Sequence, residues 1–148
     1  MIFSPNIVIQ DTIHKRKLLS KKRCVQWLSL LENQNISLTI RIICEEESQS
    51  LNYKYRKVNK PTNILSFLID NNPLVGDLVL CHPIIKQEAR IQKKKIEDHY
   101  THLLIHGYLH LLGFNHEKNQ DALIMEKREI NVLRKLGIKN PYKSNIIK

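Results

Sequence analysis

Residues 106–116 read His-Gly-Tyr-Leu-His-Leu-Leu-Gly-Phe-Asn-His, and this stretch decides how the chain folds around a candidate site. His106 and His110 are four residues apart, so on an α-helix both rings lie on one face, about 6 Å apart along the axis. Gly113 has no Cβ and can adopt the left-handed conformation that ends a helix and turns the chain back. We therefore predict that His116 joins His106 and His110 around one metal ion.

The spacing H-x-x-x-H-x-x-G-x-x-H has the ligand and glycine positions of the extended zincin motif. Structural zinc sites are usually closed by four protein ligands, whereas catalytic sites keep three ligands and one open position. Three histidines therefore favour a metal-dependent hydrolase, and three imidazoles suit nickel and copper as well as zinc. The alternative is a histidine pair hydrogen-bonded in the core, which the combined spacing of histidines and glycine disfavours.

Position 107 argues against a peptidase. Metalloproteases with this spacing carry Glu directly after the first His, where it acts as general base, but this chain has Gly107. A peptidase would need another carboxylate, such as that of Glu117, to face the metal. A phosphodiester makes a different demand, because a metal and an arginine together can stabilise the negative charge of its transition state.

A chain of 148 residues is long enough for one core, so we expect a single domain over residues 1–148, with a poorly ordered tail at 140–148. It has no run of 18 apolar residues and no signal-peptide pattern at the start, which predicts a cytoplasmic protein without a membrane partner. Cys24, Cys44 and Cys81 are widely spaced, so we expect reduced core residues.

The formal net charge is +10, which favours a polyanionic partner such as nucleic acid. However, 17 of the 24 basic residues are Lys, and 20 Ile and 13 Asn accompany them, a pattern that a genome poor in G and C also produces. Three basic runs, His14–Lys17, Lys21–Arg23 and Lys93–Lys95, are each either a solvated face or a nucleic-acid contact.

Hydrophobic periodicity predicts interleaved strands and helices, with Trp27 in the core. The predicted strands are Asn6–Gln10, Ser37–Cys44, Asn63–Leu68 and Val75–Cys81; the predicted helices are Ser20–Asn33, Glu45–Lys57, Pro83–Lys95, Asp98–Leu112 and a last one through Ala122–Leu136. The last two strands are joined by a loop at Asp70–Pro73. The pattern predicts an α+β fold with a small mixed sheet covered by helices.

Two further polar residues are candidates for a supporting role. Asp77 lies inside an apolar strand and needs a partner, so it is either a structural hydrogen-bond acceptor or a group that orients a metal ligand. His102 lies one helical turn before His106 and either moves protons or packs beside the site.

The chain resembles the YbeY family of bacterial endoribonucleases over about residues 45–142. The resemblance is carried by Leu51-Asn52-x-x-Tyr55-Arg56, by Pro-Thr-Asn-Ile-Leu-Ser-Phe at 61–67, by Gly76-Asp77 and by the segment 102–116. It implies a single α+β domain with a small, mostly parallel sheet of four strands. It also implies one zinc ion per chain, bound by His106, His110 and His116.

The resemblance further implies a single-strand-specific endoribonuclease that matures small-subunit ribosomal RNA, especially its 3′ end, and acts in ribosome quality control. Its partners would be ribosomal RNA and the small subunit or a ribosomal protein. Arg56 matches the family's functionally important arginine, and a planar guanidinium suits a phosphate. The alternative for Arg56 is a surface salt bridge to the acidic start of the helix at Glu45.

Asn115 departs from the family, which usually has Asp before the third His. Asn keeps one acceptor oxygen but loses the charge, so we expect lower turnover than in relatives. The alternative function is a non-catalytic ribosome-assembly or RNA-binding factor with a structural zinc. For the enzyme, the nucleophile is either the 2′-OH of the RNA or a metal-activated water.

Overall fold

The computed structural model describes residues 5–14, 18–31 and 35–142. Strands and helices follow one another as β1 (Asn6–Asp11), α1 (Lys21–Ser29), β2 (Ser37–Ile43), α2 (Glu45–Arg56), β3 (Ile64–Asn71), β4 (Leu74–Cys81), α3 (His82–Ile91), α4 (Ile96–Leu111) and α5 (Asn119–Lys135). All of the predicted elements are present. The main difference in the strands is that β3 continues through Asp70, which was expected in a loop and instead pairs with Val75.

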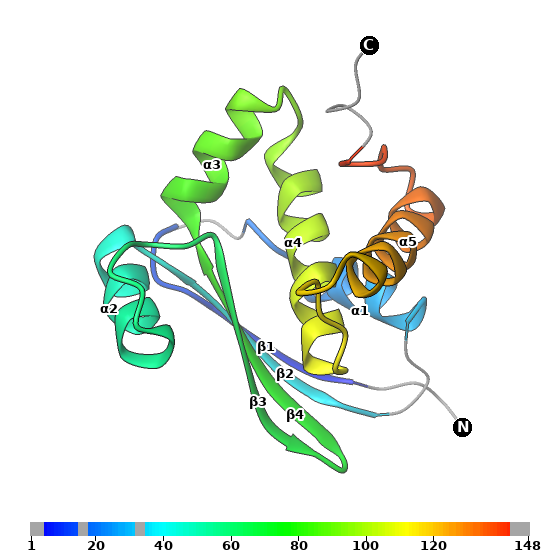
Figure 1. Cartoon of the computed structure of the whole chain (residues 1–148), viewed down its shortest axis with the longest axis horizontal. Helices are drawn as coiled ribbons and strands as arrows, with labels where there is room; N and C mark the ends of the chain where they lie inside the picture. The colour runs from blue at the N-terminus through cyan, green and yellow to red at the C-terminus, as the bar shows by residue number, and fades with distance from the viewer. Residues whose placement is uncertain (1–4, 15–17, 32–34, 143–148) are drawn as a thin grey trace.

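The four strands form one sheet in the order β1-β2-β4-β3 (Figure 1). β1, β2 and β4 are parallel, while β3 runs antiparallel to β4 and lies at one edge. This confirms the α+β fold with a mixed, mostly parallel sheet of four strands. The direction of the strands could not be read from the hydrophobic pattern and came only from the family resemblance.

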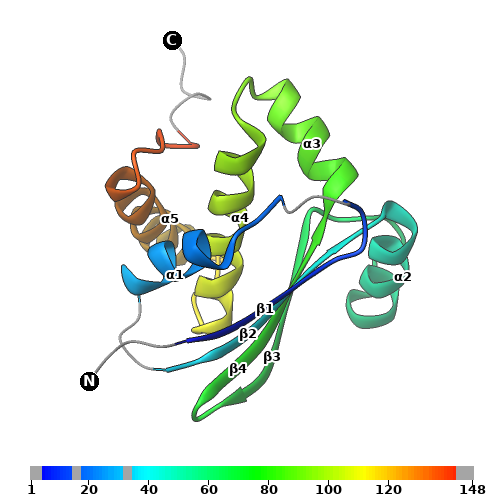
Figure 2. The ribbon, with the colours of Figure 1, turned by 180° about the vertical axis from the view of Figure 1, so that it is seen from behind.

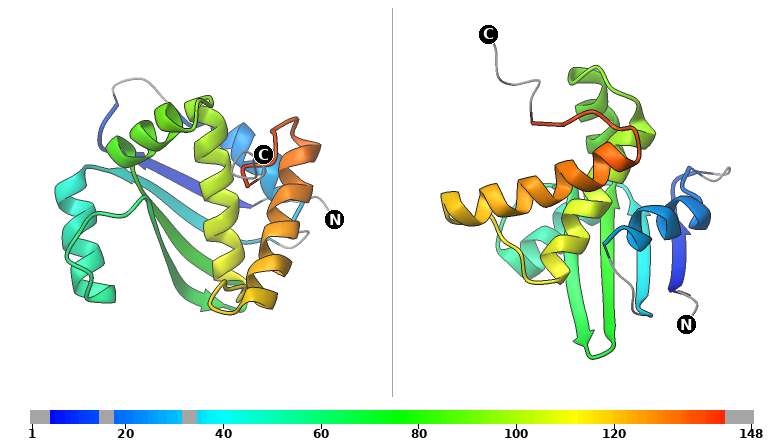
Figure 3. Two further views of the ribbon diagram at one scale, coloured as in Figure 1. Left: turned by 45° about the horizontal axis from the view of Figure 1, so that its top comes forward. Right: turned by 90° about the vertical axis from the view of Figure 1, so that its right-hand side faces the viewer.

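Helices cover the two faces of the sheet unequally. α1, α4 and α5 lie on one side and α2 lies on the other (Figures 1 and 2), and α5 packs against α4 (Figure 3). Trp27 is fully buried in the larger layer, as predicted, and its ring meets Tyr108 edge-on at 6.0 Å between centroids. A smaller apolar cluster of Ile43, Leu65 and Val79 lies outside this main core, with Leu51 of α2 packed against it.

Three boundaries of the first four helices differ from the prediction by two residues or more. α1 begins after Ser20, whose hydroxyl accepts the Arg23 N–H at 3.1 Å, but it ends at Ser29 and not at Asn33, and residues 32–34 lie outside the described ranges. α3 ends at Ile91 because Lys93 adopts a left-handed backbone with φ of 54°, so the expected continuation to Lys95 was wrong. α4 begins two residues earlier than expected, at Ile96, which packs against the core.

The tail was expected to be poorly ordered from Asn140, and this is wrong for its first residues. Tyr142 is partly buried, and its hydroxyl donates a hydrogen bond of 2.6 Å to a carboxylate oxygen of Glu129. A buried carboxylate needs such donors, which is the physical reason that the chain packs here. Residues 143–148 lie outside the described part, as do Lys15, Arg16 and Lys17 of the first basic run.

All three cysteines are free, and Cys24 and Cys81 are buried, as expected for reduced core residues, whereas Cys44 is half-buried. Within the described residues, no helix combines the length and the apolar character that crossing a bilayer requires.

Candidate metal centre and its groove

Two glycines place the histidine segment. Gly113 takes φ of 101°, the left-handed conformation predicted for it, and its N–H donates to the His110 carbonyl at 3.0 Å as α4 ends. Gly107 lies where α4 touches the sheet, and an added Cβ would stand 2.7 Å from Ile64 Cδ1 and 2.9 Å from Ser66 Oγ. The side of the helix next to His106 is therefore pressed against β3. Any side chain at position 107, including the glutamate of a peptidase, would require these neighbouring side chains to move.

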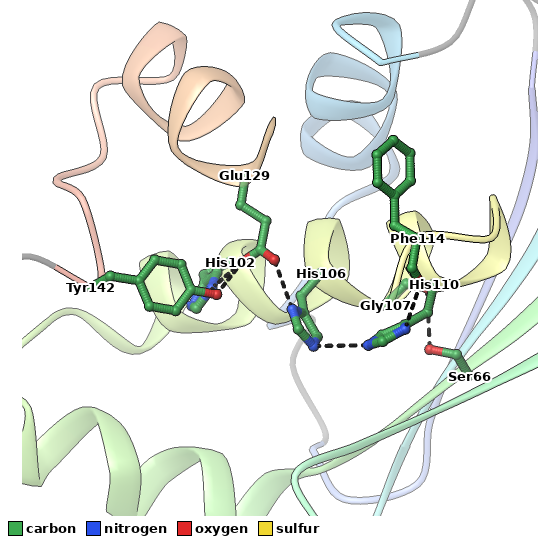
Figure 4. A network of polar contacts seen from close by, with 8 residues as sticks. All are labelled: Ser66, His102, His106, Gly107, His110, Phe114, Glu129 and Tyr142. Atoms are coloured by element: carbon green, nitrogen blue, oxygen red, sulfur yellow. Dashed lines mark hydrogen bonds and ion pairs between the residues drawn. The ribbon is translucent and has the colours of Figure 1, made fainter. Parts of the chain in front are cut away.

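His106, His110 and His116, called here the histidine trio, come together as the spacing predicted. One ligand atom from each ring lies within 4.8 Å of those of the other two. The Nε2 atoms of His106 and His110 are 3.1 Å apart (Figure 4). Two nitrogens held by one tetrahedral zinc at about 2.0–2.1 Å lie about 3.3–3.4 Å apart, so the spacing of this pair is close to that of a bound pair.

The hydrogen bonds behind the two helical rings fix their tautomers. His106 Nδ1 lies 2.8 Å from the carboxylate of Glu129, and His110 Nδ1 lies 3.0 Å from the Phe114 carbonyl (Figure 4). A carbonyl and a carboxylate only accept, so both Nδ1 atoms carry the hydrogen, and when the rings are neutral both Nε2 atoms present lone pairs. Two lone pairs that face each other at 3.1 Å repel, and a cation between them removes the repulsion. The residues present therefore fit a metal ion.

Glu129 supports this arrangement from α5. It is fully buried and accepts from three donors, namely His106 Nδ1, His102 Nε2 at 2.7 Å and the Tyr142 hydroxyl. Burial by itself raises the pKa of Glu129, but the hydrogen bonds from His102, His106 and Tyr142 outweigh it and lower the pKa to about 2. The carboxylate is thus charged at neutral pH, and it holds His106 in the tautomer that leaves Nε2 free to bind a metal.

Glu129 was missed by the sequence analysis, although the sequence carried a signal. Met125, Val132 and Leu133 form the buried stripe of α5, and Glu129 falls on the same face at helical spacing. A carboxylate within an apolar stripe needs a buried partner. The buried position of Glu129 could thus be read from the sequence, but the identity of its partners depends on how α5 packs across α4.

The two supporting candidates from the sequence lie away from the groove side of the trio. His102 is buried one turn before His106 and contacts Glu129 from the other side, and burial lowers its pKa. Asp77 pairs with Phe67 across the β3–β4 ladder, while its neighbours Gly76 and Leu78 face α4. Side chains alternate along a strand, so Asp77 points to the opposite face and does not meet the histidines.

A groove of about 720 Å³ lies in front of the histidine trio and crosses the edge strand β3. Arg56, at the C-terminal end of α2, lines its opposite wall. Arg56 is exposed, and within the described residues it makes no ion pair, so the alternative of a salt bridge to the start of α2 is not observed. Asn115 and Glu117 also line the groove; Asn115 Oδ1 accepts the Glu117 N–H at 3.4 Å, and the Glu117 carboxylate is not part of the metal-ligand cluster.

The loop between α2 and β3 is tied down by two buried polar side chains. Ser48 Oγ donates to the Thr62 carbonyl at 2.9 Å and accepts the Thr62 N–H at 3.0 Å, and Asn52 Nδ2 donates to the Lys60 carbonyl at 2.9 Å. Both side chains come from α2, so they fix the distance between the end of α2 and the start of β3. These hydrogen bonds therefore anchor the loop that leads from Arg56 into β3.

Together, the fold and the site define a class: a mixed α+β protein with a three-histidine candidate metal centre that opens onto a groove lined by Arg56. Residues 9–137 match the family model described as Endoribonuclease YbeY. The chain belongs to this family.

Curated relatives agree over most of the chain. Endoribonuclease YbeY of Colwellia psychrerythraea is 46% identical over 148 residues, covering 92% of this chain and 96% of the relative. Endoribonuclease YbeY of Buchnera aphidicola is 46% identical over 132 residues, covering 86% and 84%. A solution structure from Thermotoga maritima has a TM-score of 0.61 at 23% identity and covers 88% of this chain and 91% of that one, which supports the fold alone.

Proposed function

We propose that this chain is a zinc-dependent endoribonuclease that cleaves single-stranded RNA. The observation that carries the proposal is the histidine trio, which opens onto the same groove that Arg56 lines. Membership of the endoribonuclease YbeY family supports it. A structural zinc is usually enclosed by four protein ligands, and only three candidate ligands gather here within the described residues, which favours catalysis over a purely structural metal.

Each group of residues at the groove has its own role in RNA cleavage. His106, His110 and His116 would each offer one nitrogen to a zinc ion, which would supply Lewis-acid chemistry for a phosphodiester when bound. Arg56 donates two parallel hydrogen bonds to phosphoryl oxygens and stabilises the charge that develops on them. Glu129 and the Phe114 carbonyl keep the Nδ1 protons in place, so that the Nε2 atoms remain available as ligands.

The finer biological role follows the family. We propose that the substrate is ribosomal RNA in the cytoplasm, that the reaction matures the 3′ end of the small-subunit RNA, and that the protein acts in ribosome quality control with the small subunit or a ribosomal protein as partner. The net charge of +10 supports a polyanionic substrate of this kind.

The test is metal content and cleavage measured together. Wild-type protein should cut a single-stranded RNA, lose activity with a chelator and regain it with zinc, and contain one zinc per chain by elemental analysis. A His110→Ala variant should lose both zinc and cleavage, while His14→Gln, a change outside the trio, should keep both. Full cleavage by metal-free His110→Ala protein would refute the proposal. The product ends identify the nucleophile, since a cyclic phosphate results only from attack by the 2′-OH.

A further inference from the structure

We infer that Tyr55 and Phe67 form a stacking platform for one unpaired nucleobase beside the scissile phosphate. The inference rests on the proposed function, because it assigns the part of the groove that reads the single-stranded character of the RNA. Both rings line the groove that holds the histidine trio, on the wall where Arg56 lies.

The two rings are arranged as a supported aromatic surface. Their centroids are 5.0 Å apart and their planes meet at 64°, an edge-to-face contact. Phe67 packs against the apolar cluster of Ile43, Leu65 and Val79, so its ring is anchored in the protein. Tyr55 rests on this anchored ring while 56% of its surface stays exposed. An exposed ring that is held in place can receive a base without a large loss of side-chain entropy.

The charges around Tyr55 match a nucleotide. Arg56 follows Tyr55 directly in the chain and lines the same groove, and Lys54 Nζ lies 5.2 Å from the centre of the Tyr55 ring. A nucleotide has a flat apolar base and a charged phosphate joined by a sugar, so a base on Tyr55 leaves its phosphate near the guanidinium of Arg56. Groove-lining cations next to aromatic rings are the common arrangement of proteins that bind single strands.

The platform gives a physical reason for acting on single strands. A base inside a duplex has both faces covered by its neighbours and cannot stack on a side chain, whereas an unpaired base can be splayed out. Stacking is tolerant of sequence because every base has an aromatic face. The groove therefore selects the unpaired state of a nucleotide and not its identity.

Tyr53 provides a matched control. It lies on α2 two residues before Tyr55 and is exposed to the same fraction, 56%, but it does not line the groove. Tyr53→Ala and Tyr55→Ala remove the same ring from the same helix at the same exposure. Any general effect of losing a surface tyrosine from α2 on RNA affinity appears in both variants. A loss of affinity seen only in Tyr55→Ala is therefore due to the ring that lines the groove.

The experiment is a double-mutant cycle, in which a protein variant is combined with an RNA that lacks one base. The zinc-loaded protein is titrated with a dye-labelled single-stranded RNA, and binding is followed by fluorescence anisotropy, with the length of the RNA checked by gel afterwards. The same RNA is then prepared with one abasic nucleotide, moved along the strand one position at a time. We expect Tyr55→Ala to weaken binding by about tenfold, the order of one lost stacking contact. Tyr55→Phe should bind as wild type does, and so should Tyr53→Ala.

The abasic series makes the assignment specific. At one position of the strand, removing the base should weaken binding to the wild-type protein about tenfold relative to the intact RNA. The Tyr55→Ala variant should bind that abasic RNA and the intact RNA equally well. Two results would overturn the platform. One is that Tyr53→Ala and Tyr55→Ala lose the same amount of RNA affinity. The other is that, at every position of the strand, removing the base weakens binding to Tyr55→Ala by the same factor as binding to wild type. If the protein cleaves RNA but shows either of these results, the platform alone fails. If it shows the predicted cycle but never cleaves, the proposed function fails and the platform stands.

Discussion

The Glu129 carboxylate lies 2.8 Å from Nδ1 of His106, and this contact joins α5 to the candidate metal centre on α4. Glu129 contacts no other member of the histidine trio by a hydrogen bond within the described residues, so any effect of Glu129 on a bound metal would pass through His106. Carboxylates in this position orient the ring and increase the basicity of its metal-binding nitrogen. The packing of α5 is therefore tied to the orientation of the His106 ring on α4.

Replacing Glu129 with Gln should weaken zinc binding by about 10- to 100-fold, because an amide offers one acceptor where three donors converge. Zinc affinity is measured by competition with a chromophoric chelator. Glu97→Gln, an exposed change on α4, is the control and should bind zinc as wild type does. Tyr142→Phe removes one donor that does not touch the trio, and it should have a smaller effect than Glu129→Gln. Wild-type zinc affinity in Glu129→Gln would show that the carboxylate does not act on His106.

Replacing Arg56 with Ala should lower the rate of RNA cleavage by about 10²- to 10³-fold, the usual effect of losing a hydrogen-bond donor that stabilises charge in a transition state. Zinc content and the urea midpoint should stay at their wild-type values, because Arg56 is exposed and makes no ion pair within the described ranges. Arg56→Lys keeps the charge but not the paired hydrogen bonds, so it should recover only part of the rate. Arg128→Ala, an exposed arginine on α5, is the control.

A charge reversal at the same position separates the two functional classes. An Arg56→Glu protein that folds and holds zinc but fails only in cleavage supports the enzyme. One that cleaves normally and fails only to associate with the ribosome would support the non-catalytic assembly factor instead.

Gly107→Ala should destabilise the protein by about 1–3 kcal/mol, the usual range for overpacking, even though Ala favours a helix. The new Cβ would stand 2.7 Å from Ile64 Cδ1, which is closer than carbon atoms normally approach. Urea unfolding gives the free energy. Ile64→Val removes that Cδ1, so the double variant should be more stable than the sum of the two single changes predicts. Strict additivity of the two changes would show that the close approach of α4 to β3 is not what requires glycine.

How far the sequence predicted this site depended on whether the contacts were local. The convergence of the histidine trio followed from spacing along one helix and from one glycine, so it could be predicted and was confirmed. The role of Glu129 depends on the packing of α5, 23 residues beyond His106, and no local pattern names that partner. The face on which Asp77 lies depends on the pairing register of β3 and β4, which a short apolar run does not define.

The pH dependence of stability should carry a contribution from His82. Its ring contacts His14 Nε2 at 3.2 Å and the Tyr100 hydroxyl at 2.8 Å. Burial lowers the pKa of His82 and the nearby His14 and Lys86 add to this, while Asp11 opposes it. The unfolded chain therefore takes up a proton near pH 6.5, before the folded ring does, and acid favours unfolding. The contribution is complete above pH 6.5 and is lost as the pH falls below that value.

A His82→Asn variant isolates this contribution. At pH 8 it should be less stable than wild type by about 1 kcal/mol, because the contacts to His14 and Tyr100 are lost. The difference in unfolding free energy between the two proteins should then shrink as the pH is lowered from 6.5 toward 5. A difference that stays constant over this range would show that protonation of His82 does not affect folding.

Asn115→Asp should raise zinc affinity and the rate of RNA cleavage, each by several-fold. Asn115 lines the groove directly before His116, and its Oδ1 already accepts the Glu117 N–H, so an aspartate can keep this contact and the local turn. The added negative charge attracts the cation at the trio, in a groove where charges are only partly screened by water. Glu117→Gln removes a charge from the same loop and should lower zinc affinity slightly, which checks that the effect follows the sign of the charge. If Asn115→Asp changes neither quantity while Glu129→Gln weakens zinc binding, the metal centre is controlled from α5 and not from the loop that carries His116.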